Sequence, residues 1–243
     1  MKIAVAGKGG AGKTSITAGL AKAFAEKHQV IAVDADPSYN LASVLGIKKP
    51  KPLAEQKTLV EERARMPGGL VRMNPDVADL VDEYAAKVSA NLRLIVMGTV
   101  TGAGKGCLCP ENALLRSLLS NLVLKRDEYV VIDLEAGFEP MSRGTVKAID
   151  ALLIVCEPSA NSISVSTKLV SLAGEAGIGK ALVVANKTCG KQDLDFIADS
   201  LEVFHELPFD GQYSSLSRGG GYPSGTVFDG KVRELAAKIG DLN

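Results

Sequence analysis

Eight residues near the amino terminus have the composition of a phosphate-binding loop. They read Gly7-Lys8-Gly9-Gly10-Ala11-Gly12-Lys13-Thr14 and follow a short apolar run. A strand before the loop and a helix after it are the context that this motif requires. Glycines let successive backbone N–H groups face phosphate oxygens, and the start of the helix adds its positive dipole end. The spacing therefore predicts a nucleotide phosphate site.

The side chains of such a loop have separate tasks. Lys13 is expected to reach the β- and γ-phosphates, while the Thr14 hydroxyl binds Mg²⁺. The predicted ligand is ATP or ADP with Mg²⁺. The remaining contacts to the nucleotide are expected from Gly9, Gly10, Ala11, Gly12 and Ser15.

Lys8 is a second lysine inside the loop, and a generic phosphate cradle does not need it. A lysine at this position cannot easily fold back onto the phosphates of its own chain. It can cross a dimer interface and contact the nucleotide of a second subunit, as an arginine finger does in other systems. Lys8 therefore predicts a homodimer that completes the catalytic site.

The surrounding elements must place this loop at one edge of a sheet. Apolar runs of strand length recur along the chain, and most do not alternate with polar residues, which is typical of parallel strands covered on both faces. Helical patterns separate them. This order predicts an α/β fold, a doubly wound and mostly parallel sheet of about seven or eight strands with helices on both faces, forming one domain over 1–243. The apolar runs are Ile3–Ala6, Val30–Val33, Leu92–Met97, Tyr129–Ile132, Ala151–Val155 and Ala181–Ala185.

The Lys-Gly-Gly-x-Gly-Lys-Thr form of the loop resembles the deviant Walker A ATPases. That family includes the MinD and ParA ATPases, the nitrogenase iron protein and the arsenite-pump ATPase, in which ATP drives two subunits into a face-to-face dimer. The resemblance implies that Asp36 is the catalytic aspartate that orients or deprotonates the attacking water. It also implies that Asn40 senses the γ-phosphate or the Mg²⁺ shell. Asp34 matches less closely and can serve to hold the strand end.

Other strand ends extend the same resemblance. Asp133 ends an apolar strand, as a Walker B motif needs, and is expected to hold Mg²⁺ through water. Gly137 lies in the implied switch II, with its N–H near the γ-phosphate. Asn186 and Lys187 resemble the base-reading pair of this class, and Cys189 replaces the aspartate of a guanine reader, which favours ATP. Pro208 falls where the family closes over the adenine.

Cys107 and Cys109 are one residue apart in a glycine-flanked segment followed by a proline. Two such thiolates make half of a tetrahedral site for a soft or borderline metal. A symmetric dimer would supply the pair twice and so give four thiolates across the interface. The residues alone leave open an iron–sulfur cluster, a redox couple, or two unrelated cysteines.

The block from Cys107 to Asn112, Cys-x-Cys-Pro-Glu-Asn, resembles the CooC-type nickel-insertion ATPases that mature carbon monoxide dehydrogenase. This resemblance implies an ATP-hydrolysing metallochaperone that carries nickel or zinc on Cys107 and Cys109, between two chains, to a client nickel enzyme. The related maturation of acetyl-CoA synthase is the other client it allows. Residues 139–142, Glu-Pro-Met-Ser, depart from the family's pattern and leave the client open.

Composition excludes several other classes. The chain has 28 basic and 28 acidic residues and no tryptophan, so neither nucleic acid nor a membrane surface is an expected partner. It carries no signal peptide pattern and no long apolar run, which predicts a cytoplasmic protein. Residues 46–65 are expected to form a mobile basic excursion with a short helix from Leu53.

Two rival functions remain from the family resemblance. An ATP-gated iron–sulfur electron donor like the nitrogenase iron protein would hold a cluster between subunits, but it spaces its cysteines far apart. A positioning ATPase of the MinD/ParA type would bind membrane or DNA, and the cysteine pair would then have no role.

Overall fold

Eight strands form one sheet in the order β3-β4-β2-β5-β1-β6-β7-β8. The computed structural model describes residues 1–36, 38–98, 110–125, 128–134 and 149–242. Only β3 runs antiparallel to its neighbour, so the predicted doubly wound, mostly parallel sheet is confirmed. The strands are β1 (Lys2–Gly7), β2 (Val30–Asp34), β3 (Ala86–Lys87), β4 (Leu92–Val96), β5 (Tyr129–Asp133), β6 (Ala151–Cys156), β7 (Ala181–Thr188) and β8 (Val203–Pro208).

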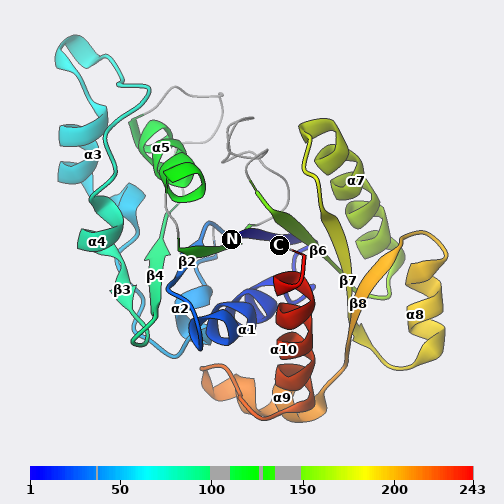
Figure 1. Ribbon diagram of the computed structural model, residues 1–243. Helices are drawn as coiled ribbons and strands as arrows, with labels where there is room; N and C mark the ends of the chain where they lie inside the picture. The colour runs from blue at the N-terminus through cyan, green and yellow to red at the C-terminus, as the bar shows by residue number, and fades with distance from the viewer. Residues whose placement is uncertain (37, 99–109, 126–127, 135–148, 243) are drawn as a thin grey trace.

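Helices cover both faces of the sheet (Figure 1). One face carries α3, α4, α5, α7 and α8, and the other carries α1, α2, α9 and α10. The helices are α1 (Lys13–Ala25), α2 (Leu41–Val44), α3 (Lys57–Ala64), α4 (Leu80–Tyr84), α5 (Pro110–Lys125), α7 (Ala160–Ala176), α8 (Lys191–Ala198), α9 (Gly211–Leu216) and α10 (Val227–Gly240). Short 3₁₀ turns lie at Leu53–Glu55, Pro67–Gly69 and Ser217–Gly219.

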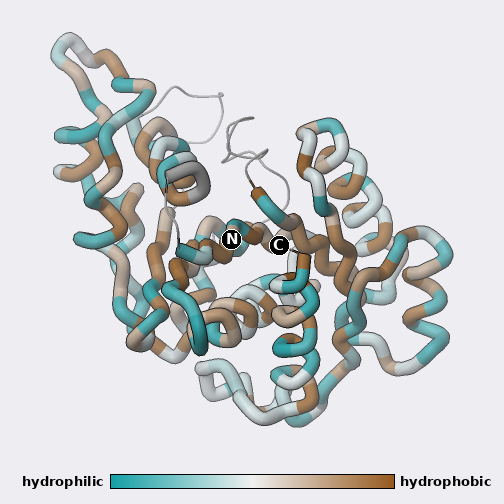
Figure 2. Tube along the Cα trace, viewed as in Figure 1, coloured by the Kyte–Doolittle hydropathy of each residue, from teal (hydrophilic) through white to brown (hydrophobic). Residues whose placement is uncertain are grey.

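The central strands are apolar throughout because both of their faces are buried. In β5, Val130 and Ile132 pack into the core on the α5 side, while Val131 between them packs into the core on the α1 side. Successive side chains of a strand point to opposite faces, so a strand covered twice needs no polar alternation. Figure 2 shows this as continuous brown colour along the middle strands, whereas the helices alternate between teal and brown.

The helix layers also confirm smaller expectations. Cys156, which follows the apolar run Ala151–Val155, is fully buried at the end of β6, as is usual for a small apolar residue. The excursion at 46–65 contains the expected helical turn from Leu53 and then α3, whose Leu59 and Val60 are buried. Within the part of the chain that the structure describes, no helix has the length and apolarity needed to cross a bilayer.

Strand register decides which polar side chains meet at the carboxyl edge of the sheet. β5 lies between β1 and β2, and its Asp133 is level with Val5 on one side and with Asp34 on the other. β6 lies on the other flank of β1, where Gly7 is level with Val155. The phosphate loop after β1 therefore opens beside the ends of β2, β5 and β6, which is where ligands bind in this kind of sheet.

Candidate nucleotide-binding site

The predicted phosphate loop connects β1 directly to α1. Two glycines are required by its shape. Gly7 has a φ of 149° and lies so close to β6 that an added Cβ would be 2.5 Å from the Val155 carbonyl oxygen. Gly12 precedes the first turn of α1 with a φ of 100°, and a Cβ there would collide with the amide of Asn186. Only glycine meets both conditions, so the loop can curl with its N–H groups at the helix start.

Lys13 and Thr14 begin α1 and face the ends of the neighbouring strands. The Lys13 side chain is buried, and its ammonium lies 3.5 Å from the Lys8 carbonyl oxygen and 3.9 Å from the Asp36 carboxylate. A buried ammonium without a close ionic partner is costly, and the phosphates of a nucleotide would complete its coordination. Lys13, Thr14 and Asp36, predicted from three separate positions, are therefore brought together.

Two carboxylates, Asp34 and Asp133, lie fully buried at the ends of adjacent strands. One Asp34 oxygen accepts a hydrogen bond from the Leu41 N–H at 3.0 Å. Its other oxygen and both oxygens of Asp133 have no hydrogen-bond partner within the described residues. Asp34 therefore holds the start of α2 as well as ending β2, which accounts for its weaker match to a direct site residue.

Burial raises the pKa of Asp133 to about 7, against the opposing influence of the Thr14 hydroxyl, and nearby Asp34 raises it further. Burial also raises the pKa of Asp34 to about 6, although the Leu41 N–H opposes the change. Unpaired buried carboxylates are unfavourable unless a cation joins them. Oxygen ligands beside a Thr hydroxyl are what Mg²⁺ prefers, so the residues present fit the predicted magnesium position at Thr14 and Asp133.

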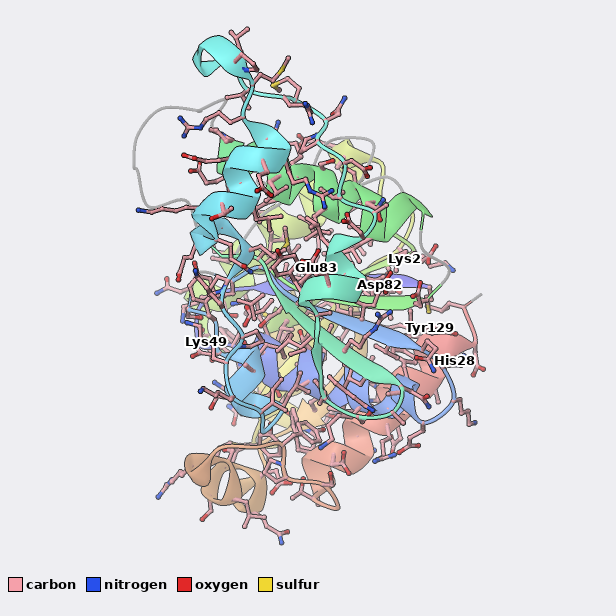
Figure 3. The ribbon with its side chains drawn as sticks, turned by 90° about the vertical axis from the view of Figure 1, so that its left-hand side faces the viewer. Lys2, His28, Lys49, Asp82, Glu83 and Tyr129 are labelled. Atoms are coloured by element: carbon pink, nitrogen blue, oxygen red, sulfur yellow. The ribbon has the colours of Figure 1, made fainter. Side chains whose placement is uncertain are left out.

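The segment after β2 contains Asp36 and Asn40, the predicted switch residues. Asp36 accepts hydrogen bonds from the backbone N–H of Ser38 at 2.9 Å and from its hydroxyl at 2.5 Å. Asn40 is exposed at the residue that precedes α2. Tyr39 between them adopts a φ of 50°, which is rare for a residue with a side chain and is concentrated at functional sites. The Lys49 ammonium, labelled in Figure 3, lies 4.3 Å from the Tyr39 ring centre and so ties the basic excursion to this segment.

Glu157 is a site residue that the sequence reasoning missed. It follows β6 and accepts from Lys8 Nζ at 3.0 Å on one oxygen, while Lys187 Nζ lies 3.3 Å from the other. Burial alone would raise its pKa, but the two lysines outweigh burial and lower it. Its position directly after an apolar strand could have indicated a site residue in the sequence. Within one chain, Lys8 therefore pairs with Glu157.

Replacing Glu157 with glutamine is expected to tighten the binding of Mg-ADP by roughly threefold to tenfold at low ionic strength, because a negative charge beside the phosphate loop is removed. Titration calorimetry at low and high salt measures this effect, which should shrink as salt screens it. Glu175→Gln on α7 is the matched control. An unchanged affinity at low salt would show that Glu157 lies too far from the phosphates to matter.

Asn186 and Lys187, the predicted base readers, brace the phosphate loop in this structure. The Asn186 amide donates to the Ala11 carbonyl at 2.7 Å, and Lys187 Nζ donates to the Gly10 carbonyl at 2.5 Å. Lys187 also has a φ of 62°, so it is the second strained residue beside the loop. Both residues still line a cavity next to Gly12.

That cavity, about 160 Å³ in volume, has an aromatic and polar wall. Pro208, which was predicted to close over the adenine, lines it together with Ser15, Phe209 and Tyr213. Asp210, also missed from the sequence, shapes the wall because its carboxylate accepts hydrogen bonds from the N–H groups of Gln212, Tyr213 and Phe228. A flat apolar base would find aromatic surface here and polar groups at the rim.

Three predicted residues, Cys107, Cys109 and Gly137, lie outside the described residues. Among the residues that are described, no group of three or more His, Cys, Asp and Glu side chains could hold a metal ion. The prediction of nickel or zinc on Cys107 and Cys109 therefore rests on the sequence.

Comparison with known proteins supports a nucleotide-binding family. The family described as CobQ/CobB/MinD/ParA nucleotide binding domain matches residues 2–218. The carbon monoxide dehydrogenase accessory protein CooC of Rhodospirillum rubrum is 39% identical over 232 residues, covering 90% of this chain and 88% of that protein. An uncharacterised ATP-binding protein of Methanocaldococcus jannaschii is 40% identical over 86% of each chain.

Solved structures show the same fold at much lower identity. MinD of Pyrococcus horikoshii, complexed with Mg-ADP, matches with a TM-score of 0.69 and 18% identity, covering 99% of this chain and 96% of that one. A ParA family ATPase from Chlorobium tepidum matches with a TM-score of 0.69 and 18% identity over 97% of both chains. The resemblance drawn from the phosphate loop and the cysteine block is confirmed at the level of family. The chain belongs to the CobQ/CobB/MinD/ParA family of nucleotide-binding domains and is a P-loop ATPase of the type that includes MinD, ParA and CooC.

Proposed function

We propose that this chain is an ATP-dependent metallochaperone that delivers nickel to carbon monoxide dehydrogenase. The observation that carries the proposal is the 39% identity to a carbon monoxide dehydrogenase accessory protein over nine-tenths of the chain. The Cys107 and Cys109 pair is the second support, because a cargo-carrying ATPase needs a metal ligand that a generic ATPase does not. Acetyl-CoA synthase is the alternative client.

The nucleotide chemistry follows from the residues at the carboxyl edge. Lys13 neutralises the β- and γ-phosphates, and Asp36, 3.9 Å from the Lys13 ammonium, orients the attacking water. Thr14 and Asp133 hold Mg²⁺, which when bound offsets the charge of the phosphates. Asn40 and the Gly137 N–H respond to the γ-phosphate. The base occupies the cavity lined by Asn186, Lys187 and Pro208.

Two such chains are proposed to meet face to face when ATP is bound. Lys8 then exchanges Glu157 of its own chain for the nucleotide of the partner. Each chain contributes one Cys107 and Cys109 pair, so the dimer offers four thiolates to the nickel cargo. Because nucleotide and metal both act on one dimerisation equilibrium, each must change the affinity for the other by the same factor.

Replacing both cysteines with serine tests the metal assignment. The Cys107→Ser, Cys109→Ser variant is expected to lose stoichiometric nickel while binding Mg-ATP as the parent does, since serine is a poor ligand for nickel. Size-exclusion chromatography with metal analysis, run without nucleotide and with ADP or ATP, measures both properties. Cys189→Ser is the control, because Cys189 is exposed but belongs to no pair. Full nickel occupancy in the double variant would refute the assignment of Cys107 and Cys109 as metal ligands. A parent protein that binds zinc in place of nickel would refute nickel as the delivered metal.

Likeness to positioning ATPases favours a second candidate. MinD of Synechocystis is 26% identical over 76% of this chain, so a metal-free switch on a surface is the rival function. The metallochaperone and the positioning ATPase differ in what they bind. Activation of nickel-free carbon monoxide dehydrogenase by nickel-loaded protein and ATP supports the chaperone. Nucleotide-dependent binding to lipid vesicles or DNA, without activation, supports the rival. A coloured protein purified without oxygen would instead indicate an iron–sulfur cluster.

A further inference from the structure

Residues 64–75 form a hairpin that no part of the proposed function uses. Arg65 and Val71 make an antiparallel bridge, and the Met66 N–H donates to the Leu70 carbonyl at 2.8 Å. A second hydrogen bond of 2.8 Å runs from the Arg72 N–H to the Ala64 carbonyl. Gly68, with a φ of 78°, lets the chain reverse at the 3₁₀ turn. These residues are called the 64–75 hairpin below.

The base of the hairpin is fixed to the body of the protein. Ala64 is fully buried, and Val77 just beyond the hairpin is 3% exposed. Arg63 pairs with both oxygens of the Asp79 carboxylate, and the Ser117 hydroxyl of α5 donates to the Pro75 carbonyl at 2.8 Å. A hairpin anchored on both sides presents its tip in a defined geometry, which lowers the entropic cost of binding a partner.

The hairpin exposes three large apolar side chains, two beside its turn and one next to its base. Met66 and Leu70 flank the turn and are 40% and 64% exposed, and Met73, which follows the Arg72–Ala64 pair, is 48% exposed. They are three of the eight large apolar side chains exposed on the described residues. Figures 1 and 3, viewed at right angles, both show the tip as the outermost point of the molecule, beyond α3. Methionine and leucine gathered on a projecting tip are typical of a contact surface that adapts to its partner.

The charged residues within the hairpin itself have one sign. Arg65 and Arg72 are exposed, and the sequence contains no acidic residue from 64 to 75. The nearest carboxylate to Arg65 is Glu61 of α3, at 4.0 Å and itself largely exposed. Arginine is enriched at protein interfaces, where its planar group pairs with carboxylates. The complementary surface therefore has an apolar centre with carboxylates around it.

The hairpin is also continuous with the edge of the sheet that carries the site. Just before α3, the Ala54 N–H donates to the Met97 carbonyl at 3.0 Å, directly after β4. The neighbouring Gly98 approaches Pro52 and Ala54 so closely that a Cβ would be 3.0 Å and 2.9 Å from their side chains. Gly98 is the last described residue before the segment that contains Cys107 and Cys109. The segment before α3 therefore packs against the residues that precede the cysteine segment in the chain.

We propose that the 64–75 hairpin is the docking surface for the client enzyme, and that it recognises an acidic protein surface with an apolar centre. A second copy of the chain is a poorer occupant, because residues 64–75 carry two arginines and no acidic residue, so two-fold pairing of the hairpins would bring like charges together. A lipid surface is also poorer, since three side chains and two charges give weak membrane binding. The proposal rests on the proposed function, which supplies the client.

Affinity for nickel-free carbon monoxide dehydrogenase from the same organism tests the proposal. Met66→Ser with Leu70→Ser, and separately Arg65→Glu with Arg72→Glu, are expected to weaken binding of the intact chain by roughly tenfold or more. Leu172→Ser, which removes an exposed apolar side chain from α7, is the control and should bind as the parent. Mg-ATP affinity and the unfolding temperature confirm that each variant is folded.

The outcomes separate the two proposals. If the parent chain binds the client and both hairpin variants bind it equally well, the hairpin assignment is wrong and the chaperone function stands. If the parent does not bind the client at all, the proposed function fails first. Loss of self-association in the hairpin variants, or loss of binding to vesicles containing anionic lipid, with client binding unchanged, would assign the hairpin to a second copy or to a membrane. If the affinity for the client falls with salt in the parent but not in the Arg65→Glu, Arg72→Glu variant, this supports carboxylates on the client around its apolar centre.

Discussion

Replacing Asp133 with asparagine is expected to stabilise the nucleotide-free protein and to reduce magnesium-dependent ATP hydrolysis on the order of a hundredfold or more. Asp133 is fully buried, neither of its oxygens has a hydrogen-bond partner in the described chain, and burial raises its pKa to about 7. Ionising it without a cation therefore costs free energy in the folded state. The neutral amide removes that cost and also removes the negative oxygen that holds Mg²⁺.

The same shift sets the pH dependence of stability. The folded-state pKa of Asp133 lies above its ordinary value of 3.8, so the folded chain binds the proton more tightly than the unfolded chain. Its stabilising contribution is present below about pH 4 and is lost as the pH rises through about 7. A pKa shift of about three units corresponds to a change of roughly 4 kcal/mol in the free energy of unfolding, as an upper limit. Asp34 shares this change, because its ionisation is coupled to that of Asp133.

Urea unfolding of the nucleotide-free protein from pH 4 to pH 8 without magnesium measures this effect. The parent is expected to lose stability over that range, and Asp133→Asn is expected to lose clearly less. Asp199→Asn, at an exposed position on the surface after α8, should follow the parent. A parallel pH profile for the parent and Asp133→Asn would mean that Asp133 is not protonated in the folded chain. Added Mg-ATP should stabilise the parent more than the variant, because only the parent retains the metal ligand.

Replacing Lys8 with alanine is expected to leave ATP binding nearly unchanged while reducing hydrolysis by on the order of a thousandfold or more, as loss of a finger residue does elsewhere. Within one chain, Lys8 pairs with Glu157, whereas the buried Lys13 is placed for the phosphates of its own loop. Lys13→Ala should therefore lose nucleotide affinity as well as hydrolysis. Fluorescent ATP titration and phosphate release distinguish the two lysines.

Mixing two inactive variants tests whether Lys8 acts in a second subunit. Lys8→Ala retains Asp36, and Asp36→Asn retains Lys8, so a mixed dimer contains one complete site if each lysine serves the partner's nucleotide. Random mixing should restore roughly a quarter of the parent rate, because half of the dimers are mixed and each has one working site. The control is a mixture of the Lys8→Ala, Asp36→Asn double variant with the Asp36→Asn variant. It should restore no activity, because neither chain retains Asp36. No recovery in the first mixture would place the action of Lys8 within its own chain.

The sequence by itself determined the phosphate loop, the parallel sheet and the family. These features are local: a glycine pattern between a strand and a helix, and apolar runs long enough to be buried on both faces, need no knowledge of distant contacts. Asp133 ends such a run, and Asp36, which lies shortly after another, was implied by the resemblance to the deviant Walker A ATPases. The cysteine pair and Lys8 were recognisable from residue type and spacing, and both pointed to a second subunit.

Only the tertiary structure decided which of these residues meet. Strand order places β6 beside β1 although nearly 150 residues separate Lys8 from Glu157, so the carboxylate that holds Lys8 was not visible along the chain. Register between β2 and β5 makes Asp34 and Asp133 neighbours inside the sheet, where burial raises both pKa values and Asp34 raises that of Asp133 further. The folding of residues 64–75 back on themselves likewise brings the exposed Met66 and Leu70 to the two sides of one turn. Such proximities depend on strand order, register and chain reversal, which no single segment of sequence encodes.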